Sequence, residues 1–422
     1  MALNMILRAV DTVDTPLLYI TIIIATLFFS LTTSTPKLHS GFPTAGLDQT
    51  GRFNHIEKAR KNWLKRSKEI VTEGLKAFPG CFQVITATGP KIVLPGEFAD
   101  EIRNQPDLHF KKAISNEFFG TYPGFEPFAV DDAHQIGVEV VRGRLTQSLN
   151  LITEDLAQET ASAIKTLCGQ PQEWTPIQYK PMLLHLVVQV STRIFIGPSL
   201  STNKAWLDVS VNYATQSFLA AEALRRWHPA LRPLVHWVLP ECRELRSQLA
   251  RAREILAPVV QKRRAEIFPS ASKVADTIGW IDEAARGRDY DVVVLQLGLS
   301  LAAIHTTSNL VSGIITDLGA HLEWVGPLRQ EMQDMLGEHG WTKKALQEMR
   351  LTDSMMKVSQ RWHLGDVVSM QCITTKPVTL SDGTTIPKDA SIVVSLAKMT
   401  TAKDYKPDRF LELRSQPGQM TK

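Results

Sequence analysis

The stretch from Asp291 to Glu323 constrains the fold more than any other part of the sequence, because it predicts one long apolar helix. Its middle, residues 302–308, reads AAIHTTS and places polar side chains in a row. A buried polar group costs about 1–3 kcal/mol when it lacks a partner. Thr306 and Thr307 could bond to carbonyls of their own helix, with His305 capping a neighbour. The alternative is that these side chains line a cavity, and the pattern alone leaves both interpretations open.

The composition is that of one large globular domain or two ordinary ones. Hydrophobic residues make up 44% of the 422 residues and charged residues 21%, which excludes an intrinsically disordered chain. The 47 basic residues are offset by 43 acidic ones and are spread along the chain, so nucleic acid is not an expected partner. The four cysteines lie too far apart for a metal motif or a disulfide framework.

An uncharged apolar run, LLYITIIIATLFFSL, occupies residues 17–31. It has about three-quarters of the length that usually spans a bilayer, and polar residues beside it can extend it. A buried core helix and a cleaved signal peptide are the alternatives, but the preceding flank carries two aspartates and one basic residue. Basic residues are enriched after the run, which favours a cytosolic body. We therefore predict a single-pass anchor over residues 1–36 in the endoplasmic reticulum membrane and a cytosolic domain over residues 37–422.

Periodicity predicts that this domain is mainly α-helical with small β-sheets. The aromatic stretch 118–128, FFGTYPGFEPF, is expected to be an ordered loop, because prolines and glycines interrupt it. The polar stretch 269–289 is expected to separate the helices before it from the next one, and no clear element is expected in the tail from residue 405. The predicted helices are 56–77, 132–150, 155–168, 177–195, 204–227, 241–267, 291–323 and 341–362, and the predicted strands are 82–86, 91–94 and a hairpin within 378–394.

Several segments carry a family resemblance. LTDSMMKVSQRWH followed by VTLSDGTTIPKDASIVV resembles the helix-plus-hairpin region of fungal cytochromes P-450, and LAAIHTTSNL resembles their central oxygen-binding helix. FFGTYPGFEPF, RRWHPALRPLVHWVLPECRELRSQLARAREIL and YKPDRFLELRSQPGQ are also similar to segments of this family. The resemblance covers nearly the whole chain in order, so we expect a cytochrome P-450-like fold, that of a heme-thiolate monooxygenase.

The resemblance implies the chemistry and its residues. Thr306, with His305 and Thr307, matches the positions that activate oxygen and relay protons, and a histidine is a proton donor near neutral pH. Ala302 and Ala303 match the small residues beside the heme cofactor. The implied partners are an NADPH-cytochrome reductase, the membrane and a hydrophobic substrate, such as a terpenoid or alkaloid of fungal secondary metabolism.

Three departures from the family pattern affect these expectations. The family's axial cysteine lies in a glycine-rich loop downstream of the hairpin, and none of Cys81, Cys168, Cys242 or Cys372 has that context, so no metal ligand is assigned. Val358 stands where the family's Glu-x-x-Arg pair has its glutamate, although Arg361 is present. The segment between the hairpin and residue 409 is short.

These departures predict a C-terminally truncated chain that lacks the heme-ligand loop and the final helix. Two interpretations follow. The chain is either a monooxygenase with an incomplete sequence or a catalytically inactive, membrane-anchored remnant, such as one that binds or regulates a partner.

Overall fold

The computed structural model describes residues 37–422 except 48–54, 266–276, 364–365, 397–404 and 417–422. The predicted anchor over residues 1–36 lies outside the described residues. The helices are α3 (His55–Ala77), α4 (Ala99–Ile102), α5 (Phe110–Glu117), α6 (Asp132–Glu139), α7 (Leu149–Cys168), α8 (Tyr179–Phe195), α9 (Pro198–Ser201), α10 (Lys204–Arg226), α11 (Arg232–Val235), α12 (Pro240–Ala265), α13 (Thr277–Ala285), α14 (Val292–Ala320), α15 (Val325–His339), α16 (Lys343–Glu348), α17 (Arg350–Trp362) and α18 (Arg409–Arg414).

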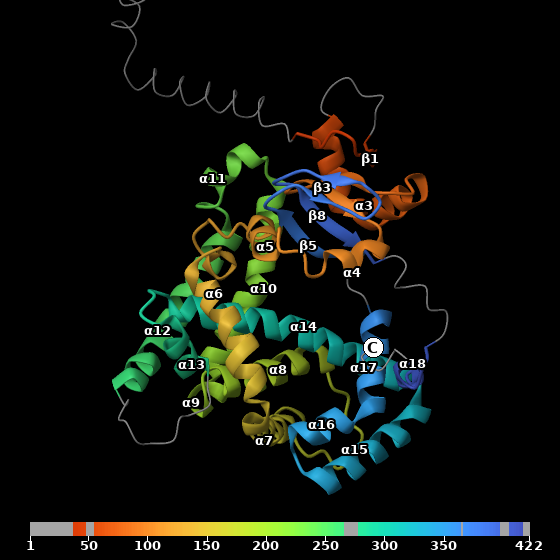
Figure 1. Cartoon of the computed structure of the whole chain (residues 1–422). Coiled ribbons are helices and arrows are strands. Elements are labelled where there is room, and N and C mark those ends of the chain that lie inside the picture. Colours follow the sequence, from red (N-terminus) through yellow and green to blue (C-terminus); the bar gives the residue numbers. More distant parts are fainter. Residues whose placement is uncertain (1–36, 48–54, 266–276, 364–365, 397–404, 417–422) are drawn as a thin grey trace, which may run out of the picture.

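A six-stranded sheet occupies one end of the molecule, beside α3, and the larger helices pack below it (Figure 1). Its strands follow the order β1 (Thr44–Ala45), β2 (Phe82–Thr86), β3 (Gly89–Leu94), β8 (Ser391–Ser395), β5 (Val368–Thr374) and β4 (Leu108–His109). β3 and β8 pair in parallel, so the sheet joins the two ends of the described chain. β6 (Val378–Thr379) and β7 (Thr385–Ile386) form a separate hairpin.

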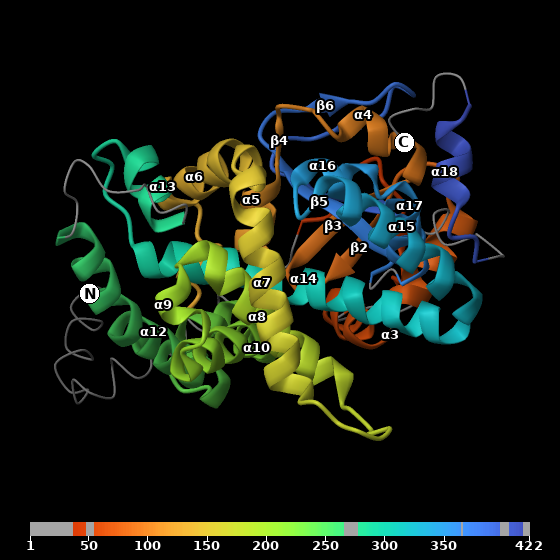
Figure 2. The ribbon, with the colours of Figure 1, turned by 90° about the horizontal axis from the view of Figure 1, so that it is seen from below.

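Helix α14 crosses the middle of the molecule, from α12 and α13 on one side to α17 on the other (Figures 1 and 2). Asp291 caps its start, because its carboxylate accepts hydrogen bonds from the amides of Val293 and Val294 at 2.9 and 3.1 Å. It packs against α8, α10 and α17. Among the described helices it is the one long and apolar enough to cross a membrane, yet it lies inside the folded body.

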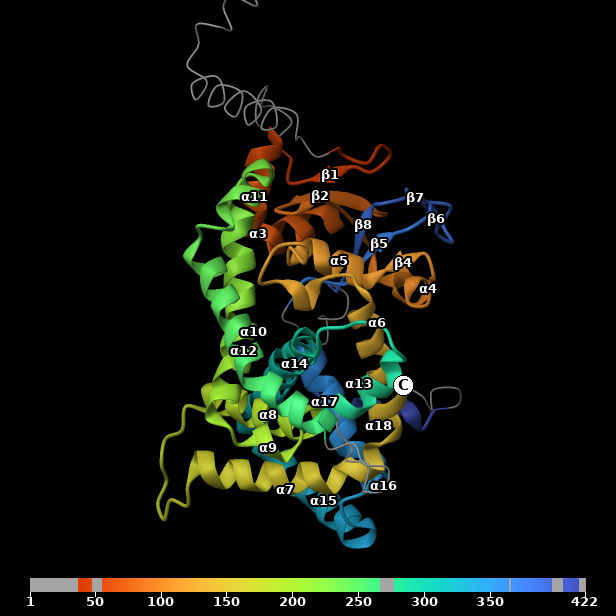
Figure 3. The ribbon, with the colours of Figure 1, turned by 90° about the vertical axis from the view of Figure 1, so that its left-hand side faces the viewer.

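The largest core lies between α10, α12, the first half of α14 and the aromatic stretch 118–128. α10 and α12 run side by side down one flank of the molecule (Figure 3). Trp206 and Tyr213 of α10 are completely buried in this core, and so is Phe125 of the aromatic stretch. The aromatic stretch is therefore part of the packed interior and is held against the helices that surround α14.

The structure confirms a mainly helical fold with small sheets and corrects four local predictions. α7 begins at Leu149, so the predicted break between helices 132–150 and 155–168 is wrong. α13 lies within the polar stretch that was expected only to separate two helices, and burial of its Ile278 and Ile281 holds it in the core. The hairpin is limited to β6 and β7, while β8 joins the large sheet. The tail contains α18, which contacts α17.

Tyr213 supplies the first test of this packing. Its hydroxyl donates a hydrogen bond to the carbonyl of Gly124 at 2.7 Å, and both groups are buried. Tyr213→Phe leaves that carbonyl without its donor, so we expect the free energy of unfolding to fall by about 1–3 kcal/mol in urea denaturation. Tyr179→Phe is the control, because its hydroxyl makes an exposed contact of 3.4 Å with Thr316. Equal losses in the two variants would contradict this assignment.

Candidate active site

The middle of α14 presents small and polar side chains that are not covered by protein. Ala302 and Thr306 are both exposed, and residues four apart lie on the same face of a helix. Thr307 is also exposed, and Ala303 is partly buried. Ile304 and Ser308, on the opposite side, are buried. The central helix of the molecule therefore has an open face at the positions that the sequence singled out.

The Thr306 hydroxyl donates a hydrogen bond to the Ala302 carbonyl at 2.7 Å. This confirms for Thr306 the bond to its own helix that was one of the two sequence interpretations. A hydroxyl retains two acceptor lone pairs when its proton is donated. Because the side chain is also exposed, Thr306 can still accept a hydrogen bond from a molecule on the open face.

The ring of His305 points toward α10 and does not cap a neighbouring element. Its ring lies edge-to-face with Phe218, with centroids 5.3 Å apart, and its Nε2 is buried without a hydrogen-bond partner among the described residues. Burial lowers the pKa of His305 from its ordinary value of 6.5. The imidazole is therefore neutral near pH 7.

This lowered pKa predicts a pH dependence of stability. Below pH 6.5 an unfolded His305 binds a proton that the folded one does not, so acid favours unfolding. The contribution of the neutral ring to the free energy of unfolding is complete above pH 6.5. It is lost progressively as the pH falls toward the pKa of His305 in the folded protein. In urea denaturation at about pH 7.5 and about pH 5.5, we expect His305→Gln to lose less stability on acidification than the wild type. Equal losses of stability in His305→Gln and in the wild type would contradict a lowered pKa of His305.

Val358 and Arg361 lie on α17, away from the middle of α14. Val358 is buried, and Arg361 is partly buried. Residues that the sequence analysis did not identify connect α17 to its neighbours. Ser354 donates to the Pro407 carbonyl at 2.5 Å and accepts from the Phe410 amide at 3.0 Å, which joins α17 to the segment around α18.

The second connection joins α17 to α14. His363 pairs with the Asp317 carboxylate at 2.7 Å. Gly313 makes room for it, because a Cβ at that position would lie 2.7 Å from the imidazole. The only sequence signal for this contact was a histidine directly after a helix, which by itself indicates nothing about its partner.

The open face of α14 could lie against a heme, but the positions of the four cysteines do not identify a thiolate ligand. Cys81 and Cys242 are buried, and Cys372 lies on β5. Burial raises the pKa of Cys81 and of Cys242 to about 11, and it also raises the pKa of Cys372. Cys168 lies at the end of α7, with its Sγ 3.3 Å from the Met182 sulfur. The described residues therefore identify no thiolate ligand for a heme.

The structure brings the aromatic stretch 118–128 close to the central helix. Phe118 stacks on Phe128 with centroids 4.5 Å apart and meets the edge of Phe218 at 5.2 Å. Phe218 in turn contacts His305. Sequence pattern indicates both the loop and the helix, but it carries no signal for the α10 side chain that connects them.

Comparison with known proteins assigns the family. The family model for cytochrome P-450 matches residues 135–419. The chain is 38% identical over 412 residues to the cytochrome P-450 monooxygenase bsc2 of Alternaria brassicicola, covering 94% of this chain and 78% of that protein. It is 40% identical over 380 residues to the cytochrome P-450 monooxygenase hepE of Aspergillus oryzae, covering 86% and 69%.

A solved structure shows the same fold. It is the retinoic acid-bound cyanobacterial CYP120A1, with a TM-score of 0.64, 15% identity, and coverage of 92% of this chain and 84% of that one. The family implies heme as the cofactor, a redox partner that supplies electrons and a hydrophobic substrate. The family-model match, the fungal relatives and the shared fold together show that this chain belongs to the cytochrome P-450 family.

Proposed function

We propose that this protein is a cytochrome P-450 monooxygenase that oxidises a hydrophobic secondary metabolite, such as a terpenoid or an alkaloid, in a fungal biosynthetic pathway. The observation that carries the proposal is the open face at Ala302 and Thr306 in the middle of the central apolar helix. The fungal relatives are cytochrome P-450 monooxygenases, which supports the same reaction class.

A heme-thiolate group, when bound, activates dioxygen and inserts one of its atoms into the substrate. The chain's own residues would serve that chemistry from α14. Ala302 and Ala303 have no side chain beyond Cβ, which leaves space at the open face. Thr306 holds its proton toward the Ala302 carbonyl and offers its lone pairs to a proton donor. Thr307 is exposed next to it. His305, one position before Thr306, would act as a proton donor only after gaining a proton and turning from Phe218, because its ring is neutral near pH 7 and packs against α10.

The proposal extends to the partners and the location. Electrons would come from an NADPH-cytochrome reductase at the endoplasmic reticulum membrane. Residues 1–36 would form the single-pass anchor, and the domain over residues 37–422 would lie on the cytosolic side. A protease-protection assay that found this domain in the lumen would contradict this arrangement.

A second candidate is an inactive, membrane-anchored remnant. Two observations favour it for a protein made of just these residues. None of the four cysteines stands in the sequence context of the family's axial cysteine: Cys81 and Cys242 are buried, Cys168 ends α7, and Cys372 lies on β5. Val358 also replaces the glutamate of the family's Glu-x-x-Arg pair.

One experiment separates the two candidates. The transcript is sequenced through and beyond the Lys422 codon, and the encoded protein is purified with hemin, reduced and exposed to carbon monoxide. A thiolate-type Soret band supports the monooxygenase, whereas its absence from the natural full-length product supports the remnant. Cys372→Ser is the matched control, since this thiol lies on β5 with a raised pKa, and the band should survive the substitution.

A further inference from the structure

Contact with a phenylalanine on α10 fixes the ring of His305. The two rings meet edge-to-face, with centroids 5.3 Å apart and planes at 88°. This geometry is favoured because the positive edge of one ring faces the negative face of the other. The Nε2 atom of His305 is buried and has no hydrogen-bond partner in the described part of the chain. Packing against Phe218, rather than a hydrogen bond at Nε2, therefore holds the imidazole.

Phe218 is itself held by ring contacts rather than by enclosure in the core. It remains 41% exposed, so burial alone does not fix its orientation. Phe118 meets it edge-to-face, with centroids 5.2 Å apart and planes at 86°. Phe118 is stacked on Phe128 at 4.5 Å with nearly parallel planes. These three phenylalanines form an aromatic column that ends at His305.

Charged groups fix Phe118, in the middle of this column. The guanidinium of Arg225, near the end of α10, lies 5.3 Å from the Phe118 ring centroid. The same guanidinium pairs with the Glu117 carboxylate at 3.2 Å. Glu117 also binds Lys91 of β3 at 2.5 Å, and these attractions keep the pKa of its carboxyl lowered despite burial. The aromatic column is thereby attached to both α5 and the large sheet.

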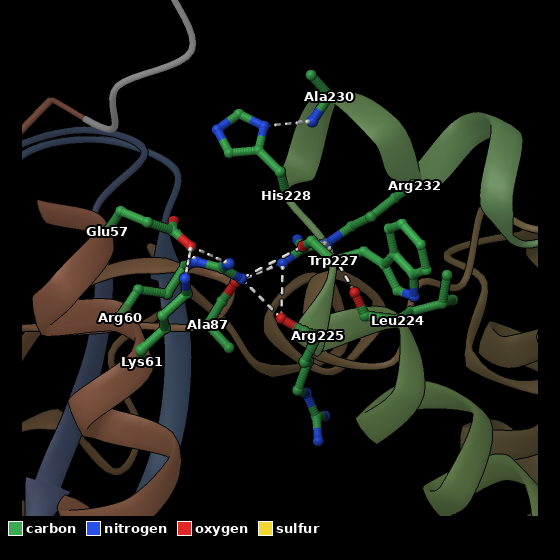
Figure 4. A network of polar contacts seen from close by, with 10 residues as sticks. All are labelled: Glu57, Arg60, Lys61, Ala87, Leu224, Arg225, Trp227, His228, Ala230 and Arg232. Atoms are coloured by element: carbon green, nitrogen blue, oxygen red, sulfur yellow. Dashed lines mark hydrogen bonds and ion pairs between the residues drawn. The ribbon is translucent and has the colours of Figure 1, made fainter. Parts of the chain in front are cut away.

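Two buried arginines cap the end of α10 (Figure 4). Arg60 of α3 donates to the Arg225 carbonyl at 2.7 Å. Arg232 of α11 donates to the Leu224 carbonyl at 3.1 Å and to the Ala87 carbonyl at 2.7 Å. The last carbonyls of a helix lack donors within the helix and carry partial negative charge, so guanidinium groups stabilise this end. About two turns separate it from Phe218.

We propose that Phe218 is a positioning residue for His305. It holds the imidazole against α10, and the arginine-capped end of α10 keeps the aromatic column in place. The inference rests on the proposed function, because it concerns the histidine of the oxygen-activating helix. The alternative is that Phe218 is an exposed apolar side chain without influence on His305. In that case its removal leaves the imidazole environment unchanged.

The test measures the titration midpoint of His305 by NMR. The full chain is labelled at histidine and studied in detergent, and His305→Gln identifies the resonance. Burial is the cause of the lowered pKa, and no charged group contributes to it. We therefore expect Phe218→Ala to shift the midpoint upward, toward 6.5, and Phe218→Leu to give a smaller shift. Leu219→Ala, the exposed neighbour on α10, is the matched control and should give no shift.

An unchanged midpoint in Phe218→Ala, or an equal shift in Leu219→Ala, would overturn the positioning role. The carbon monoxide spectrum distinguishes this failure from failure of the proposed function. A heme-thiolate band together with an unchanged midpoint rejects the role of Phe218 and leaves the monooxygenase in place. A shifted midpoint without the band supports the contact between Phe218 and His305 and rejects the oxygenase chemistry.

Discussion

Phe125→Ala is expected to lower the free energy of unfolding by about 3–5 kcal/mol, because it removes a fully buried aromatic ring and leaves a cavity. The centroid of the Phe125 ring lies 6.3 Å from that of Phe119 and 6.5 Å from that of Phe128. Such aromatic pairs contribute about 0.5–1.5 kcal/mol each beyond their buried area. The loss should appear in urea denaturation. It should also loosen Phe128, on which the aromatic column beside His305 rests.

Phe110→Ala is the matched control for this substitution. It removes the same ring from the start of α5, where Phe110 is 58% exposed, so we expect a change within about 0.5 kcal/mol. Phe125→Leu should lie between the two, because it retains much of the buried volume. A loss below about 1 kcal/mol in Phe125→Ala would mean that the aromatic stretch is not part of the core.

Thr306→Val has the largest effect expected on activity. It preserves the shape of the side chain but removes the hydroxyl that would accept and pass on a proton at the open face of α14. Positioned proton transfer contributes about 10²–10⁴-fold to rate, so product formation should fall by a factor in this range. The measurement is formation of the wild-type oxidised product, by mass spectrometry, in the presence of reductase and NADPH.

Stability must be separated from activity in this variant. The Thr306 hydroxyl bonds to a carbonyl of its own helix, so its loss should cost only about 0.5–1.5 kcal/mol. Thr316→Val is the matched control, since Thr316 lies on the same helix, is exposed and bonds the Ser312 carbonyl at 2.9 Å. It should show a similar small loss of stability and unchanged turnover. Equal turnover in the wild type and Thr306→Val would remove Thr306 from the proposed relay.

Local pattern determined the elements on which the candidate site depends. The apolar run that begins at Asp291 specified α14, and its interruption at residues 302–308 marked the middle of that helix, because helical periodicity and capping are properties of neighbouring residues. The same local signals located α3, β2, α8, α10 and α12 to within two residues at each end. The resemblance of several segments in a fixed order was enough to indicate the family.

Tertiary structure decided everything that depends on contacts between distant residues. Sequence pattern did not predict that β8 leaves the hairpin to pair with β3, because strand pairing is set by non-local packing. It also did not predict that Phe218 meets His305, or that Arg60 and Arg232 are buried at the end of α10, since arginines are mostly exposed unless paired. The sequence by itself therefore determined the helix that carries the proposed chemistry. Only the folded chain decided which side chains hold its histidine, because those contacts join residues that are far apart in the sequence.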